Sequence, residues 1–123
     1  MHFISTEKAP AAIGPYSQAI HSKNLIFTSG QIPCDPATGA ICGTTIEEQA
    51  ECALKNLSAV LEAGGASCSS IIKTVCYLQD MKDFGTFNSI YAKYITEKPA
   101  RSCVAVAGLP KGVLCEIEAI AEV

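Results

Sequence analysis

The stretch ARSCVAV at residues 100–106, followed by VLCEIEAIAEV at residues 113–123, decides the fold of this chain. Both runs are rich in residues that favour β-strands, and turn-forming residues fill the segment 108–112 between them. The two runs are therefore predicted to be strands that pair as an antiparallel hairpin.

The last of these strands has an acidic face. Alternation places one apolar set on one side of the strand, and Glu116, Glu118, Ile120 and Glu122 on the other. With a turn near 108–111, Arg101 lies directly across from Glu116 or Glu118, and Glu116 is the preferred partner. A register slip of one residue would move Arg101 to the opposite face. A fixed cation that faces a carboxylate indicates a site, whereas the alternative is a cross-strand salt bridge that contributes roughly 0 to 1 kcal/mol.

Composition predicts one domain over residues 1–123. The chain is 49% hydrophobic, and its 17% of charged residues is low for a small surface, which favours burial of part of that surface in an oligomer. The net charge of −3 and the scattered lysines leave no basic stripe, so no nucleic-acid partner is expected. No run is apolar enough for a signal peptide or a membrane span, and a cytoplasmic location without membrane contact is predicted.

The seven cysteines are expected to be reduced. Their number is odd and no two of them form a Cys-x-x-Cys pair, so neither a zinc site nor a disulfide framework is predicted. Most should be small buried hydrophobes. A catalytic thiol would need a histidine partner, and the only histidines, His2 and His21, lie near the N-terminal strands.

The remaining pattern alternates strands and helices. Short strands are predicted within 17–22 and 24–29, with a turn at 35–39. Thr45 and Glu48 form a capping box that begins a helix ended by Gly64-Gly65. A strand at 71–78 and a second helix at 80–96 follow, and Pro99 prevents that helix from continuing. The predicted fold class is α+β, with two helices on one face of a mixed sheet; the other face, which carries apolar residues with Arg101 and the glutamates, suits a subunit interface.

Four motifs together resemble a known family. They are GPYSQA at 14–19, TSGQIP at 28–33, Asp83-Phe84 with Asn88, and PARS at 99–102 with EIE at 116–118. In this order and spacing they resemble the reactive intermediate deaminase A family, also called the YjgF family, across essentially the whole chain. The resemblance implies a chorismate-mutase-like fold with a mainly antiparallel sheet. It also implies a homotrimer whose three sites lie in clefts between subunits.

The resemblance further implies an activity. Members of this family hydrolyse 2-imino acids, such as 2-iminobutanoate and 2-iminopropanoate, which pyridoxal-phosphate dehydratases release, to 2-oxo acids and ammonia. Arg101 can hold the substrate carboxylate by two parallel hydrogen bonds. Glu116 can position the attacking water and accept its proton, and proximity to Arg101 should keep Glu116 ionised. Because the imine is already reactive, no metal, cofactor or covalent nucleophile is required.

Further positions carry family roles in substrate binding: Tyr16, Ser29, Gly30, Asn88 and Cys103, the last through its carbonyl. Each role has a plain alternative. Tyr16 can be a partly buried strand aromatic, Asn88 an exposed or backbone-bonded helix residue, and Ser29 a turn residue.

The chain departs from the family pattern in one loop. Only Lys98 separates Tyr94-Ile95-Thr96-Glu97 from Pro99, where family members have several more residues, so the rim of the cleft and the substrate range can differ.

Two other classes of function remain. A non-catalytic regulatory or chaperone-like protein could bind small carboxylates through Arg101 alone. An endoribonuclease or translation inhibitor is less favoured, because the chain is acidic and lacks interleaved aromatic and basic residues.

Overall fold

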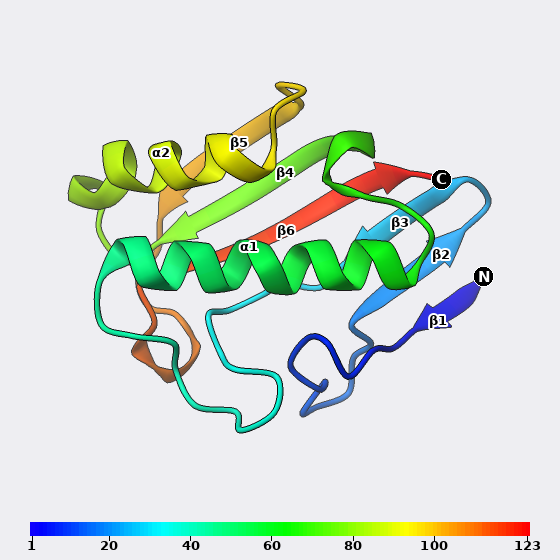
Figure 1. Cartoon of the computed structure of the whole chain (residues 1–123), viewed down its shortest axis with the longest axis horizontal. Coiled ribbons are helices and arrows are strands. Elements are labelled where there is room, and N and C mark those ends of the chain that lie inside the picture. The colour runs from blue at the N-terminus through cyan, green and yellow to red at the C-terminus, as the bar shows by residue number, and fades with distance from the viewer.

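Strands and helices follow one another along the chain as the alternating apolar patterns require. The computed structural model describes residues 1–123 as one sheet and two helices, joined by loops that include three short 3₁₀ turns (Figure 1). The elements are β1 (His2–Ile4), β2 (Ala19–Ser22), β3 (Leu25–Thr28), α1 (Ile46–Ala63), η1 (Cys68–Ser70), β4 (Ile71–Leu78), η2 (Met81–Asp83), α2 (Phe84–Tyr94), β5 (Ala100–Ala105), η3 (Pro110–Gly112) and β6 (Cys115–Glu122).

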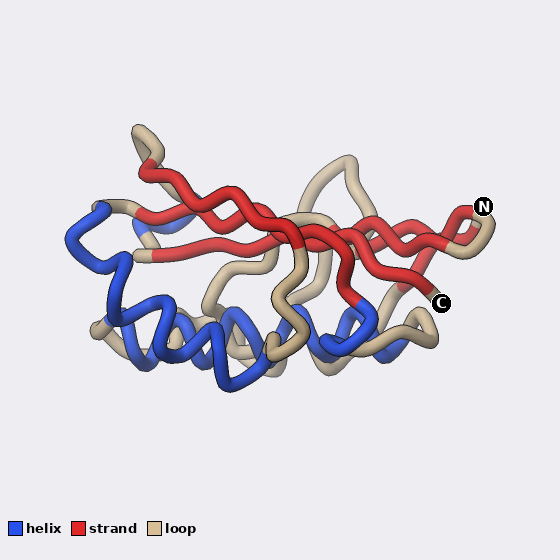
Figure 2. Tube along the Cα trace, turned by 90° about the horizontal axis from the view of Figure 1, so that it is seen from above, coloured by secondary structure: helices blue, strands red, loops and turns tan.

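The six strands form one sheet in the order β1-β2-β3-β6-β4-β5. Every neighbouring pair is antiparallel except β4 and β5, which are parallel. Both helices lie on the same side of this sheet, and the edge-on view in Figure 2 shows the two layers. The predicted class, a mainly antiparallel mixed sheet with two helices on one face, is confirmed.

The predicted hairpin between the last two strands is wrong. β5 and β6 do run in opposite directions, but β4 lies between them and pairs with both. β6 occupies the middle of the sheet, where its alternate residues are buried beneath the helices, whereas β5 is the exposed edge strand. Central placement lets β6 bury apolar side chains that an edge hairpin would leave in water.

Helix α1 forms as predicted. The Thr45 hydroxyl accepts a hydrogen bond from the Glu48 amide at 3.2 Å, and the Glu48 carboxylate accepts one from the Thr45 amide, which completes the capping box. The helix buries its apolar face against the sheet, and Leu54, Leu57 and Leu61 are fully inaccessible. Burial of each such leucine contributes roughly 1.5–3 kcal/mol, so this face anchors the helical layer.

Helix α2 is shorter than the predicted 80–96 segment. Asp80 caps a 3₁₀ turn by accepting a hydrogen bond from the Lys82 amide, and the α-helix begins only at Phe84. At the other end Ile95 is extended (φ −117°, ψ 94°), so the helix ends at Tyr94, before the predicted boundary. Because of these two differences, α2 is shorter than predicted, and it covers β4 and β5.

The face of the sheet away from the helices carries a row of apolar side chains. Phe3, Ile20, Phe27 and Ile120 stand opposite one another across β1, β2, β3 and β6. Phe3 and Phe27 are 73% and 41% exposed. Strand β1, which supplies the first member of this row, is not among the predicted strands, because its three residues are too few to show alternation.

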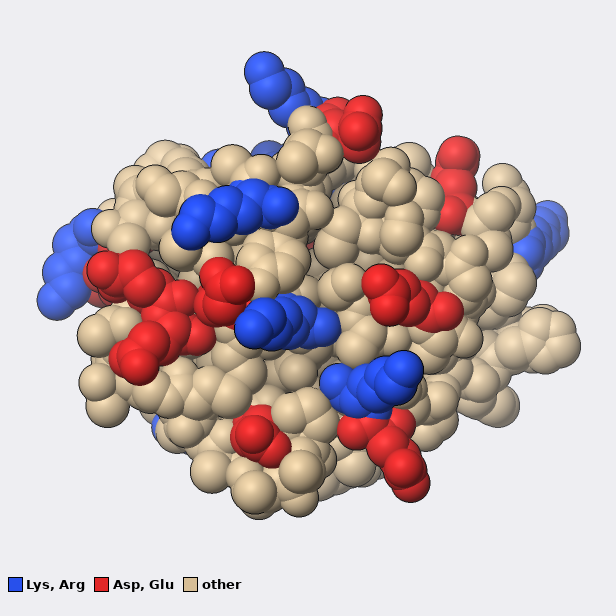
Figure 3. Space-filling view, viewed as in Figure 1, with Lys and Arg blue, Asp and Glu red and all other residues tan.

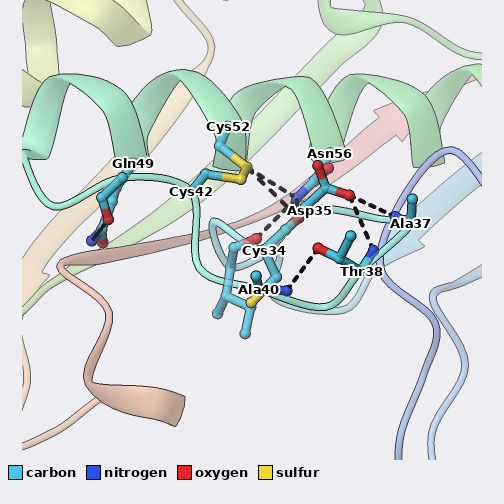
Figure 4. The surroundings of a disulfide bond; sticks show 11 residues. Cys34, Asp35, Ala37, Thr38, Ala40, Cys42, Gln49, Cys52 and Asn56 are labelled. Carbon is cyan, nitrogen blue, oxygen red and sulfur yellow. Dashed lines mark hydrogen bonds between the residues drawn. A yellow bond between two sulfur atoms is a disulfide. The ribbon is translucent and has the colours of Figure 1, made fainter.

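A disulfide joins Cys42 to Cys52, so the expectation that all cysteines are reduced is wrong for this pair (Figure 4). It connects the loop before α1 to the second turn of that helix, with Cα atoms 6.3 Å apart. Asn56, one helical turn further on, donates hydrogen bonds to the carbonyl oxygens of Ile32 and Cys34 at 3.0 and 2.9 Å. Spacing along the sequence gave no signal of this contact, because the loop folds back onto the helix.

The helical face carries charges of both signs. Figure 3 shows acidic side chains gathered at its left end and basic side chains spread singly over it, without a broad basic patch. No helix is long and apolar enough to span a bilayer.

The disulfide is tested by counting thiols. Unfolded under non-reducing conditions, the protein should expose five reactive thiols, because five cysteines are free, and seven after reduction. A thiol reagent such as Ellman's reagent measures both values. The Cys42→Ser variant frees Cys52 and should show six thiols before and after reduction. Seven thiols in the unreduced wild type would contradict the bond.

Candidate active site

Arg101 is the only arginine of the chain, and α2 holds it in place. Its Nη1 donates a hydrogen bond to the Asn88 side-chain oxygen at 2.7 Å. The guanidinium also lies over two rings of α2, 4.8 Å from the centroid of Tyr91 and 5.6 Å from that of Phe84. These contacts restrict the side chain through cation–π attraction and leave its other donors unused. None of these partners is a carboxylate.

Sequence reasoning predicted Asn88 and missed the two rings. Phe84, Asn88 and Tyr91 are spaced by four and three residues along α2, which places them on one face of a helix. Without the position of Arg101, that spacing indicates core packing alone. The predicted alternative for Asn88, a bond to the backbone, is not what the structure contains, because its side chain meets Arg101.

Cys103 follows on the same face of β5, half-buried and opposite Cys76 of β4. Burial raises the pKa of the Cys103 thiol, although the positive charge of Arg101 acts in the other direction. The pKa of Cys76 is raised to about 12, mainly by burial. A thiol with a raised pKa forms the thiolate less readily and is therefore a weaker nucleophile.

Glu116 lies in a different place, against the backbone of Gly30. A Cβ atom at Gly30 would stand 2.7 Å from the carboxyl carbon of Glu116, closer than two carbons approach without bonding. Gln31 pairs with Ile117 through two backbone hydrogen bonds of 2.7 and 3.1 Å, which fix this approach. Burial raises the pKa of the Glu116 carboxyl, and the charge of Glu118 raises it further. The expectation that Arg101 would keep Glu116 ionised is therefore wrong within one chain.

Ser29 and Tyr16 border the same region. The Ser29 hydroxyl donates a hydrogen bond to the Ser17 carbonyl at 2.6 Å and so ties the loop that carries Tyr16 to the end of β3. Tyr16 is 51% exposed and lies in a loop, so the alternative of a partly buried strand aromatic is wrong in its strand location. Together with Gly30, Tyr16 lines a surface cavity of about 200 Å³.

The predicted site residues thus form two clusters on opposite faces of the sheet. Arg101 stands opposite Thr74 in register, whereas Glu116 stands opposite Tyr77. Residues paired in register share a face, and Thr74 and Tyr77 are three apart on β4, so they point to opposite faces. The predicted direct pairing of Arg101 with Glu116 or Glu118 is therefore wrong. We call the groups the arginine cluster (Asn88, Arg101, Cys103) and the glutamate cluster (Tyr16, Ser29, Gly30, Glu116).

Titratable groups elsewhere form no larger cluster. No three His, Cys, Asp or Glu side chains converge on a common metal position. Two tyrosine–glutamate pairs were not predicted from the sequence. The Tyr77 hydroxyl donates a hydrogen bond to the Glu118 carboxylate across β4 and β6, and the Tyr94 hydroxyl of α2 donates one to the Glu51 carboxylate of α1.

The six-stranded sheet and its two helices define a small α+β protein with one polar cluster on each face of the sheet. The chain belongs to the YjgF or reactive intermediate deaminase A family: it matches the family described as Endoribonuclease L-PSP over residues 6–123.

Named relatives span nearly the whole chain. It is 54% identical to a RutC family protein of Pyrococcus horikoshii over 96% of this chain and 94% of that one. It is 49% identical to the 2-iminobutanoate/2-iminopropanoate deaminase of Salmonella typhimurium, again over 96% and 94%. The solved structure of Escherichia coli TdcF with bound serine superposes with a TM-score of 0.95 at 44% identity, covering 100% and 99% of the two chains.

The close approach at Gly30 gives a structural prediction. In Gly30→Ala the added methyl group should displace the Glu116 carboxylate while the fold is retained, because the flexible end of a side chain yields before backbone does. A crystal structure of the variant checks the displacement. Gly108→Ala is the matched control, since no atom lies within 4 Å of its added Cβ. An unmoved Glu116 carboxylate in Gly30→Ala would contradict the packing described.

Proposed function

We propose that this protein is a 2-iminobutanoate/2-iminopropanoate deaminase, which hydrolyses reactive 2-imino acids to 2-oxo acids and ammonia. One observation carries the proposal: the single arginine is held by Asn88 and Tyr91 with donors to spare, and a partly buried glutamate lies against a bare glycine backbone. The deaminase name of the Salmonella relative supports it.

Arg101 would bind the substrate carboxylate. A guanidinium offers two parallel N–H donors that match the two oxygens of a carboxylate, which orients the ligand as well as attracting it. The hydrogen bond to Asn88 fixes the plane of the guanidinium, and the Tyr91 ring supports it from one side. A substrate bound in this way presents its C=N carbon in a defined direction.

Glu116 would position and deprotonate the attacking water. Water adds to the C=N carbon as its proton passes to the Glu116 carboxylate, and Glu116 then gives that proton to the imine nitrogen, which becomes an amine. Collapse of the resulting carbinolamine then expels ammonia and leaves the 2-oxo acid. Burial raises the pKa of Glu116, which makes it a stronger base than an ordinary glutamate.

The two clusters would meet in an assembly. Because they occupy opposite faces of one sheet, neither cluster alone offers both a carboxylate-binding cation and a base. We propose a homotrimer in which the arginine cluster of one copy faces the glutamate cluster of the next. The uncovered apolar row Phe3, Ile20, Phe27 and Ile120 supports an interface on this side, since so large a patch is rarely left in water.

A second candidate is a protein that binds small amino or oxo carboxylates without converting them. The serine bound in the TdcF structure favours it, because serine carries the kind of carboxylate that Arg101 would hold and has no C=N bond to hydrolyse. Such a binder would need Arg101 and not Glu116. The endoribonuclease description of the family finds no matching basic surface on the helical face.

The first test measures hydrolysis of 2-iminobutanoate generated in situ by a threonine dehydratase. Arg101→Ala should lower kcat/KM about 10- to 150-fold through loss of a charged hydrogen-bond donor. Glu116→Gln should lower kcat about 10²- to 10⁴-fold. Lys93→Ala and Glu122→Gln, exposed changes on α2 and β6, are the matched controls. Product is followed as 2-oxobutanoate and ammonia. No acceleration by folded wild type, combined with Arg101-dependent serine binding, would favour the non-catalytic binder.

The second test asks whether one site uses two copies. Arg101→Ala and Glu116→Gln, each of low activity alone, are unfolded together and refolded as a mixture. If the clusters come from neighbouring copies of a trimer, about a quarter of the sites regain both residues, and activity should return to about a quarter of wild type. If both residues acted within one copy, the mixture would stay at the low activity of the single variants. Sedimentation analysis of the same samples gives the number of copies.

A further inference from the structure

A tyrosine and a second glutamate stand beside Glu116 without a part in the reaction described above. Glu118 lies two residues from Glu116 on β6, so both carboxylates point from the same face of the sheet. Tyr77 stands opposite Glu116 in register on β4, and its hydroxyl reaches diagonally to the Glu118 carboxylate. The three side chains form one compact group on the face away from the helices.

We propose that Tyr77 and Glu118 are positioning residues for Glu116: the tyrosine hydroxyl fixes the Glu118 carboxylate on the face that carries Glu116, and that fixed negative charge strengthens Glu116 as a proton acceptor. The inference rests on the proposed deaminase function. It extends that function from one base to a three-residue group.

The geometry sets the direction of the effect. A hydrogen bond from the Tyr77 hydroxyl stops the Glu118 side chain from turning toward open water. Residues two apart on a strand are separated by about 7 Å, a distance at which two charges near a protein surface still interact appreciably. Repulsion from the fixed charge makes ionised Glu116 less favourable, and so makes Glu116 hold a proton more tightly.

The electrostatic pattern agrees with this arrangement. The pKa of Glu116 is raised first by burial and then by Glu118. The hydrogen bond to Glu118 raises the pKa of Tyr77 to about 12, so the tyrosine stays a donor at every physiological pH. The other charged groups on this face are Lys73 of β4, which pairs with Ile120, and Glu122 at the end of β6. On the Gly30 side, Asp35 and Lys111 line the same surface cavity as Gly30 and Tyr16.

In the proposed assembly an Arg101 from a second copy would oppose this effect, because a nearby cation favours ionised Glu116. The test therefore compares how readily Glu116 ionises in different variants of the assembled protein. A plain structural role for the Tyr77–Glu118 bond, joining β4 to β6, would change stability and leave the behaviour of Glu116 untouched.

The test compares Glu118→Gln, Tyr77→Phe and the control Glu122→Gln in two measurements. The pH profile of kcat/KM should show the acidic limb of Glu118→Gln about 0.5 to 1 pH unit below that of wild type, because removal of the neighbouring charge lets Glu116 ionise more easily. Its plateau should fall about two- to fivefold as the base weakens. Tyr77→Phe should lower the acidic limb and the plateau by smaller amounts than Glu118→Gln does. Glu122→Gln should change neither the limb nor the plateau.

The second measurement follows the Glu116 side-chain carboxyl by ¹³C NMR titration, which needs no turnover. Its midpoint should fall in Glu118→Gln by about the shift seen in the acidic limb. The proposal would be overturned if Glu118→Gln changed neither the titration midpoint of Glu116 nor the acidic limb of the pH profile. That result would leave the deaminase function standing where Glu116→Gln abolishes activity. If wild type shows no acceleration, the proposed function fails, and the role of the pair in proton acceptance is overturned with it, whatever the titration gives.

Discussion

The position of β4 between β5 and β6 is the constraint on which the rest of the structure depends. Because β4 pairs with both neighbours, the side-chain alternation of a single strand fixes where the charged residues of the other two point. Arg101 pairs with Thr74 and therefore points to the helix-covered face. Glu116 pairs with Tyr77 and therefore points to the uncovered face. Parity along one strand thus separates a cation from a carboxylate that follows it closely in the sequence.

That separation gives each face a chemistry of its own. Beneath α2, aromatic rings and an amide hold the guanidinium in a fixed plane. On the uncovered face, Glu116 lies against a glycine backbone and beside a second carboxylate. A cation with unused donors and a carboxylate with a raised pKa are complementary groups, and their placement on opposite faces is what makes an assembly of copies the natural way to join them.

Local patterns in the sequence predicted much of the fold. The capping box at Thr45 and Glu48, the apolar spacing of α1, the strand at 71–78 and the α+β class all follow from interactions within a few residues, and the structure agrees. The ends of α2 were less well predicted, because a side-chain cap at Asp80 and the extended Ile95 decide them. Four family motifs identified the family, which the full-length match confirms.

Pattern along the chain identifies the candidate residues: one arginine, a strand with alternating glutamates, and an asparagine on the helix before them. The arrangement of these residues in space depends on contacts between distant parts of the chain. The Cys42–Cys52 bond joins residues 10 positions apart, the Tyr77–Glu118 contact joins residues 41 apart, and strand pairing brings Leu25 next to Glu122. The reason is physical: periodicity reports which side of an element is buried, whereas the choice of neighbouring strand depends on how much apolar surface the whole chain buries at once.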